Sequence, residues 1–364
     1  MSTKTAEEVV RMIFRSPSPM IKIEFQGGEP LLNWEVVKHI IEYAEKLNRI
    51  ASKYLEFVLC TNLTLVTEDI LAYLRLHKVR ISTSLDGPKP LHDLHRIKRD
   101  GNSSYDDFLR NLPLVRSVVG QDACSPLLTI TRDHLPRLRS VIDEYLDKGF
   151  SGIFLRAINP YGIAKTEWTT LGYPIEDFVS AYKDAFAYIL EINKSGHRFI
   201  EFYASLLLNR ILTPFSTGFV DLQSPSGAGI SGVIYDYNGD VFPTDESRML
   251  ARSGDLSFYL GNVHSSNYED IFGGMRLREI TRQTCLEVLP GCATCFYQLY
   301  CGSDPIRNYA ESGDIIGHRP SSDFCKKNMQ LFDFLFDILR ANDKKTLDVF
   351  WSWITNRDIK DVSL

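Results

Sequence analysis

The sequence has no long hydrophobic run and no excess of basic residues. Its 364 residues include 41 lysines and arginines against 46 aspartates and glutamates, which gives a formal net charge of −5. A slightly acidic chain offers no electrostatic reason to bind nucleic acid. No segment approaches the length of a membrane span, and the N-terminal residues lack the apolar core of a signal peptide. We therefore expect a cytoplasmic protein with neither a nucleic acid nor a membrane as its partner.

Cysteine is scarce over most of the chain, and five of the seven cysteines are concentrated in one short region: Cys285, Cys292, Cys295, Cys301 and Cys325. They are too few and too unevenly placed for a disulfide scaffold, so their crowding in a reducing compartment indicates metal ligation. The last four have the spacing Cys-x2-Cys-x5-Cys followed by a distant cysteine. Four thiolates suffice either for tetrahedral zinc or for a 4Fe–4S cluster, and the spacing alone leaves both open. Cys285 is an additional thiol that could be a spare ligand, a reactive group or a core residue, and the core is the expected place for it.

A short apolar strand near the N-terminus ends in an unusual turn. Residues 21–25 alternate as a buried strand does, and Gly27, Gly28, Glu29 and Pro30 follow directly. Glycines allow a ligand to approach the main chain closely, and a carboxylate at this place can accept hydrogen bonds from an amine. A simple tight turn explains the same residues equally well.

Strands alternate with helices over the first half of the sequence. We expect strands at 21–25, 55–59, 79–85, 127–131 and 152–158, with helices at 5–14, 34–51, 67–76, 105–119, 135–148 and 175–192. This alternation predicts an α/β fold with a parallel sheet, open or closed into a barrel. Polar residues follow each strand, and the carboxyl ends of such strands form the ligand-binding face.

The second half of the sequence differs in composition. Residues 198–220 are expected to form a helix, 224–229 a loop, and 328–340 an amphipathic helix. Asn238 and Gly239 between two short apolar runs are the clearest hairpin signal. The cysteine-rich region follows that hairpin.

Several of these motifs together resemble one enzyme family. They are Phe25-Gln-Gly-Gly-Glu-Pro30, Thr61-Asn62, Ser84-Leu-Asp-Gly-Pro-Lys89 with His92 and Arg96, and the late cysteines. In this order they resemble radical S-adenosylmethionine (SAM) enzymes with a SPASM extension, of the anaerobic sulfatase-maturase type. The segments 243–248 and 317–320 are most similar to the maturase of the His-Xaa-Ser peptide system.

The resemblance implies a partial (β/α)6 TIM-like barrel lacking its first strand over 1–220, a small SPASM-type iron–sulfur domain over 221–330, and a C-terminal helical segment over 331–364. It implies that Gly27, Gly28 and Glu29 bind the amino group of S-adenosylmethionine, and that Ser84 and Arg96 contact its ribose and carboxylate. Asp245 aligns with a position that acts as a base, although a solvated loop acid is an equal alternative. Cys292, Cys295, Cys301 and Cys325 would hold an auxiliary 4Fe–4S cluster.

Two departures from the family pattern matter. The Cys-x3-Cys-x2-Cys that holds the SAM-cleaving cluster is absent, because no such triplet precedes residue 285. We interpret this as a truncated or misassigned start, since the binding residues remain, and expect the chain as given to be inactive. Thr244 and Pro305 stand where the family places ligands of a second auxiliary cluster, so a single auxiliary cluster is predicted.

The resulting hypothesis is a radical SAM maturase that modifies a ribosomally made peptide by hydrogen-atom abstraction. Its partners would be a peptide or protein substrate and a reductant protein. The alternatives are a non-catalytic iron–sulfur protein that binds peptides or transfers electrons, and a zinc-stabilised α/β protein whose glycine turn is only a turn.

Overall fold

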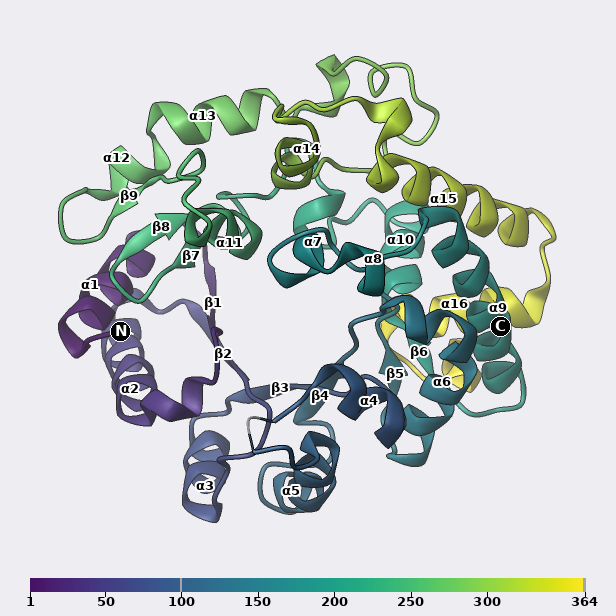
Figure 1. Cartoon of the computed structure of the whole chain (residues 1–364), viewed down its shortest axis with the longest axis horizontal. Coiled ribbons are helices and arrows are strands. Elements are labelled where there is room, and N and C mark those ends of the chain that lie inside the picture. The colour runs from purple at the N-terminus through teal and green to yellow at the C-terminus, as the bar shows by residue number, and fades with distance from the viewer. Residues whose placement is uncertain (99, 363–364) are drawn as a thin grey trace. The chain divides into compact units, whose positions relative to one another are not determined.

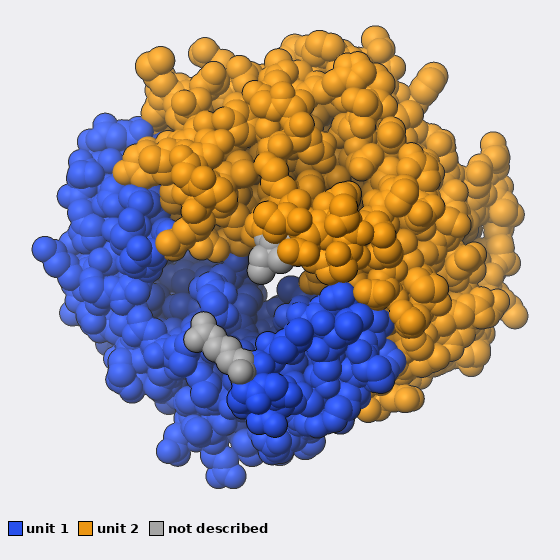
Figure 2. Space-filling view, viewed as in Figure 1, with its two compact units in different colours: residues 1–128, 235–241, 261–271 blue, residues 129–234, 242–260, 272–364 orange. Residues whose placement is uncertain are grey.

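The computed structural model describes residues 1–98 and 100–362. The chain forms two compact units, each assembled from several segments (Figure 2). Unit 1 contains residues 1–128, 235–241 and 261–271, and unit 2 contains residues 129–234, 242–260 and 272–364. Among the described residues, no helix has both the length and the apolar composition needed to cross a bilayer.

Unit 1 is built on a four-stranded parallel sheet with the order β1-β2-β3-β4 (Figure 1). Its strands are β1 (Met20–Phe25), β2 (Tyr54–Cys60), β3 (Arg80–Ser84) and β4 (Cys124–Leu127). Its helices are α1 (Thr3–Phe14), η1 (Pro30–Asn33), α2 (Trp34–Ala51), α3 (Glu68–Leu76), α4 (Lys89–His95) and α5 (Ser104–Val118). The α/β class and the parallel sheet expected from the alternating pattern are therefore present.

The two faces of this sheet differ. Ile21, Ile23 and Phe25 are buried on one face, as alternate residues of a strand must be if one side is covered by helices. On the other face of β1, Lys22 and Glu24 form an ion pair of 3.4 Å. Parallel sheets covered on both sides are usually apolar on both. The second face of β1 is polar instead, and it carries charged side chains near the end of the strand.

Unit 2 contains a two-stranded parallel sheet of β5 (Gly152–Ile153) and β6 (Ile200–Glu201). The remaining elements of unit 2 are η2 (Arg132–Arg137), α6 (Leu138–Asp147), α7 (Ile163–Thr166), α8 (Trp168–Leu171), α9 (Ile175–Lys194), α10 (Phe202–Leu212), η3 (Val220–Leu222), α11 (Asp245–Arg252), α13 (Met275–Arg282), η4 (Leu286–Val288), α14 (Pro305–Ser312), η5 (Arg319–Ser321), α15 (Asp323–Arg340), α16 (Lys344–Thr355) and α17 (Ile359–Val362). Phe186 of α9 contacts Phe334, Phe350 and Trp353, which packs α9 against α15 and α16.

The predicted boundaries at 220 and 330 stay a prediction, and α15 runs continuously across residue 330.

The expected hairpin forms around Gly239. The backbone there has φ +91°, a conformation that favours glycine. Its strands are β7 (Ile234–Tyr235) and β8 (Asp240–Phe242), and β8 pairs antiparallel with β9 (Gly261–Asn262). Helix α12 (Tyr268–Phe272) follows.

Three predicted elements are wrong in extent. The strand expected at 127–131 lies at Cys124–Leu127, because the side chain of His134 pairs with Thr131 and begins η2 there. The strand expected at 152–158 has only two paired residues, followed by an isolated bridge at Ala157. The helix expected over 198–220 is limited to Phe202–Leu212, and Glu201 caps its start.

Candidate SAM-binding and cysteine sites

The turn after β1 leaves open space beside its glycines. Gly27 has φ +132°, a conformation that L side chains rarely adopt. Gly28 has no such constraint, and a Cβ added at Gly28 meets no atom within 4 Å. Neither strain nor packing therefore explains the glycine at position 28. Gly27 and Gly28 are both exposed, so the main chain is accessible at this turn.

The carboxylate of Glu29 is held between β1 and β2. Its Oε1 accepts hydrogen bonds from Thr61 Oγ1 (2.8 Å) and from the Leu31 amide (3.0 Å), and its Oε2 accepts one from the Asn62 amide (2.9 Å). The register explains this contact, because Phe25 pairs with Leu59 and so places the ends of both strands side by side. A carboxylate offers about four lone-pair directions, which leaves one on Oε2 free for a ligand.

The end of β3 carries the next predicted residues. Ser84 is the last residue of β3 and is half-buried. Arg96 follows α4 and binds Asp86 in a bidentate ion pair through Nε and Nη2. Asp86 is almost fully buried, and its amide donates to Nδ1 of His92. Arg96 thus has a carboxylate partner within the chain, a contact that the sequence reading did not anticipate.

The four cysteines of the Cys-x2-Cys-x5-Cys…Cys motif gather in unit 2. Burial and, to a smaller extent, the neighbouring Cys301, Cys292 and Cys295 together raise the pKa of the Cys325 thiol to about 11. Burial likewise raises the pKa of Cys301, with added contributions from Cys292 and Cys295. The Cys295 amide donates to the Cys292 carbonyl at 2.9 Å, and Asn328, three residues after Cys325, donates to Cys301 Sγ at 3.5 Å, so backbone and side-chain contacts tie the four cysteines to one region.

Two buried polar side chains face these sulfurs. The guanidinium of Arg319 opposes the effect of burial on the pKa of Cys292. Its Nε is buried without a hydrogen-bond partner among the described residues. Asn328 donates through Nδ2 to Cys301 Sγ at 3.5 Å. A buried cation and an amide donor suit an anionic thiolate centre, so the residues present fit a cluster of four thiolates.

Within residues 1–98 and 100–362, no three histidine, cysteine, aspartate or glutamate side chains are grouped so that one ion is held. Cys285 is half-buried and donates to Glu287 Oε2 at 3.1 Å, so its thiol is engaged apart from the other four.

Asp245, the candidate base, is the first residue of α11. Both Nε and Nη2 of Arg248 donate to its Oδ1, at 2.8 and 2.7 Å. Thr244 caps the same helix in a capping box with Ser247. The structure therefore shows an ion pair for Asp245, and its role as a base stays a prediction.

A small cavity adjoins the cysteine site inside unit 2. It is lined by Phe154, Leu155, Arg156, Ala157, Asn159, Phe178, Tyr203, Phe219, Asp221, Asp304, Arg307, Phe324 and Lys327. Burial, followed by the neighbouring Asp221, raises the pKa of Asp304 to about 7. Burial also lowers the pKa of Lys327 to about 8, and its ammonium lies 4.8 Å from the centre of the Tyr203 ring. No sequence motif indicated this cavity.

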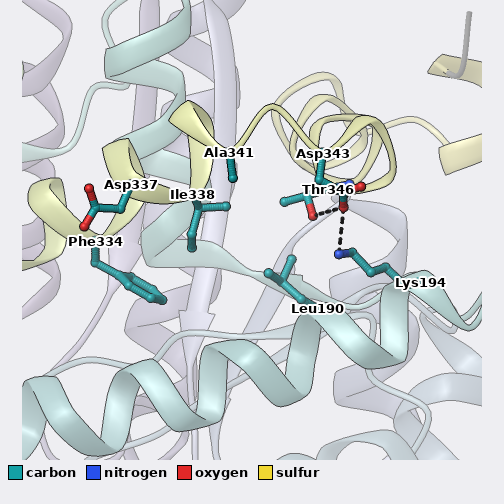
Figure 3. Close-up of a pocket in the computed structure, with 8 residues that line it drawn as sticks. All are labelled: Leu190, Lys194, Phe334, Asp337, Ile338, Ala341, Asp343 and Thr346. Carbon is teal, nitrogen blue, oxygen red and sulfur yellow. Dashed lines mark hydrogen bonds and ion pairs between the residues drawn. The ribbon is translucent and has the colours of Figure 1, made fainter.

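A second hollow lies between α9, α15 and α16 (Figure 3). Its floor is apolar, and Lys194 and Asp343 form an ion pair of 2.8 Å at one end. None of the predicted site residues lines it, so its chemistry is unrelated to the two sites above.

Comparisons with known proteins agree with this geometry. Residues 1–137 match the family described as the Radical SAM superfamily. A cysteine-type anaerobic sulfatase-maturating enzyme of Clostridium perfringens is 22% identical over 351 residues, covering 92% of this chain and 87% of the relative. An uncharacterized protein of Methanocaldococcus jannaschii is 26% identical over 251 residues, covering 68% of this chain and 84% of the relative.

A solved structure of anSMEcpe with bound AdoMet and the Cp18Cys peptide has the same fold. It matches with a TM-score of 0.76 and 21% sequence identity, covering 94% of this chain and 91% of that chain. Residues 1–137 therefore match the Radical SAM superfamily, and the chain as a whole is similar to the anaerobic sulfatase-maturating enzymes. The resemblance and the α/β fold class expected from the sequence are confirmed. The SPASM assignment of the later residues stays a prediction.

Proposed function

We propose that the chain binds S-adenosylmethionine at the ends of β1, β2 and β3. We propose further that it belongs to a maturase that modifies a peptide by hydrogen-atom abstraction. The observation that carries the proposal is the Glu29 carboxylate, which three donors hold beside the open space at Gly28. An ammonium group suits the remaining lone pair of Oε2, because charge-assisted hydrogen bonds are strong. The bound AdoMet and peptide of anSMEcpe support the ligand classes.

The remaining strand-end residues fit the other parts of this ligand. Gly27 and Gly28 leave the main chain accessible, and the Ser84 hydroxyl can bind a ribose oxygen. Arg96 uses Nε and Nη2 for Asp86, so its other N–H groups remain for a carboxylate. Asp86 thereby holds the guanidinium in place before the ligand arrives.

The same proposal assigns one auxiliary 4Fe–4S cluster to Cys292, Cys295, Cys301 and Cys325. Bound there, it would supply a one-electron centre next to the peptide. The positions where relatives hold a second cluster have structural roles here: Thr244 caps α11, and Pro305 is the buried first residue of α14. An apolar cluster beside them is formed by Tyr161, Ala228, Phe258, Ile280 and Ile306.

A second candidate function is a non-catalytic iron–sulfur protein that binds peptides or transfers electrons. It is favoured by one observation, namely that residues 1–364 contain no Cys-x3-Cys-x2-Cys. Without those thiolates this polypeptide has no site for the cluster that cleaves S-adenosylmethionine. We therefore expect ligand binding without 5′-deoxyadenosine formation from this polypeptide alone, and formation of 5′-deoxyadenosine would exclude the second candidate.

Calorimetric titration with S-adenosylmethionine tests the binding site. Glu29→Gln removes the charge and is expected to weaken binding about tenfold or more, since a hydrogen bond to a charged group contributes about 1.5–3 kcal/mol. Glu35→Gln is the matched control, because Glu35 is exposed on α2 and pairs with Lys38 rather than with any strand-end residue. Equal affinity of Glu29→Gln and the unmodified chain would contradict the proposal.

A further inference from the structure

We propose that Arg319 and Asn328, with Tyr203 behind Asn328, are positioning residues that raise the reduction potential of the four-cysteine centre. The inference rests on the proposed function, because it assumes an iron–sulfur cluster on Cys292, Cys295, Cys301 and Cys325. None of these three residues is a ligand. Each acts through the sulfurs or through a neighbour of the sulfurs.

Arg319 is a buried cation whose hydrogen bonding is incomplete. Its relative exposure is 6%, and its Nη2 donates to Ser303 Oγ at 3.2 Å. Its Nε has no partner among residues 1–98 and 100–362. Burying a charge without a counterion costs several kcal/mol, so the site is complete only when an anion is present. Its contacts place it against the cysteine segment, because a Cβ built on Gly291, next to Cys292, would lie 3.7 Å from Arg319 Cβ, and Ser303 lies two residues after Cys301.

Asn328 is fully buried on α15 and is oriented by hydrogen bonds at both ends of its amide. Its Nδ2 donates to Cys301 Sγ at 3.5 Å, and its Oδ1 accepts from Tyr203 Oη at 2.9 Å. The tyrosine hydroxyl donates only to the oxygen, so it turns the amide nitrogen toward the sulfur. Phe154 and Phe219 pack against the Tyr203 ring at 5.7 and 6.3 Å and hold it in place.

These contacts have a defined electrostatic consequence. Reduction adds one negative charge to the centre, and this charge is partly carried by the cysteine sulfurs. A nearby guanidinium and an N–H···S hydrogen bond stabilise the more negative state more than the less negative one. Potentials of iron–sulfur clusters respond to hydrogen bonds at sulfur and to local charge in this way. The three residues therefore favour the reduced form.

Spectroelectrochemical titration of the anaerobically reconstituted protein tests the inference. Arg319→Gln is expected to lower the reduction equilibrium constant at least tenfold, a shift of about 59 mV to more negative potential for one electron. Asn328→Leu is expected to shift it in the same direction, and Tyr203→Phe to do so by less. Arg319→Lys keeps the charge and should recover part of the shift.

Two matched controls separate these effects from general damage to unit 2. Arg198→Gln removes another half-buried guanidinium, which bonds to Ser352 and Asn356 away from the cysteines. Tyr188→Phe removes an exposed tyrosine hydroxyl that bonds to Asp143. Neither is expected to change the potential. If Asn328→Leu does not retain iron, Tyr203→Phe tests the same contact while the Asn328 side chain is kept.

The outcomes distinguish this inference from the proposed function. Iron near four atoms per chain together with unchanged potentials in Arg319→Gln and Tyr203→Phe would overturn the inference alone. Uptake of zinc without iron would overturn both the inference and the assigned cluster. Shifts to more negative potential in the variants, with unchanged potentials in both controls, would support it.

Discussion

The strand-end site of unit 1 and the cysteine site of unit 2 differ in how complete they are without a ligand. In unit 1, backbone and hydroxyl donors already hold Glu29, and Arg96 already has Asp86. In unit 2, Arg319 has a buried Nε without a partner among the described residues, and the thiols have raised pKa values. The first site is preorganised, whereas the second needs its occupant to satisfy its own side chains.

This difference determines how each unit responds to its ligand. A ligand that binds a preorganised site stabilises the protein by little more than the binding free energy itself. Removing that ligand leaves the fold intact. A site that buries thiols and a cation gains stability when thiolates form around metal, because metal binding is coupled to folding. Unit 2 is therefore expected to depend on its metal centre more than unit 1 depends on S-adenosylmethionine.

The largest expected effect is that of removing one cysteine of the four. Cys301→Ser should reduce iron from about four atoms per chain to nearly none after reconstitution and lower the thermal midpoint of unit 2. Iron analysis with differential scanning calorimetry measures both quantities. Cys285→Ser is the control, because Cys285 bonds to Glu287 and is not one of the four. Equal iron loss in both variants would contradict the assignment of ligands.

The next effect concerns Glu201, which ends β6 and caps α10. Glu201 is fully buried, accepts from the amides of Leu155, Tyr203 and Ala204 and from Tyr182 Oη, and burial raises its pKa to about 7. Because the folded state binds this proton more tightly than the unfolded state, the free energy of unfolding should fall as pH rises from about 4.5 to 7. The size is on the order of 3 kcal/mol.

Urea unfolding between pH 4 and pH 8 measures this dependence. Glu201→Gln stays neutral at every pH and should flatten the decline, whereas the exposed Glu191→Gln should leave it unchanged. A decline of the same slope in Glu201→Gln would show that another group carries the pH dependence.

The smallest effect separates the two glycines of the turn after β1. Gly27→Ala should destabilise unit 1 by about 1–2 kcal/mol, because alanine is strained at φ +132°. Gly28→Ala should leave stability within about 0.5 kcal/mol and should weaken S-adenosylmethionine binding, since its methyl group enters the open space. Denaturant unfolding and calorimetric titration measure the two quantities. Unchanged ligand affinity in Gly28→Ala would show that the open space holds no ligand.

The sequence predicted those features that depend on local signals. Helix α2 has the expected bounds Trp34–Ala51, and Thr67 caps α3 as expected. The turn at Gly27 and the hairpin at Gly239 were visible because glycine is favoured where φ is positive. The strand expected at 127–131 was displaced because a local Thr131–His134 hydrogen bond competes with the sheet.

The supporting contacts of the cysteine site were beyond sequence reasoning. Tyr203 and Asn328 are 125 residues apart and meet only through packing of α10 and α15. Arg319 lies in the segment 317–320 that carried part of the family resemblance, but nothing in the sequence showed that it is buried next to the cysteines. The Asp86–Arg96 pair spans ten residues, and the motif indicated both residues without showing that they bind each other.

Iron and acid-labile sulfide per chain after anaerobic reconstitution, measured with the absorption spectrum, test the central claim most directly. A single cluster predicts about four iron atoms, about four sulfides and absorption at about 400 nm if its ligands are Cys292, Cys295, Cys301 and Cys325. A colourless chain that binds one zinc, or a brown chain with about eight iron atoms, would contradict it.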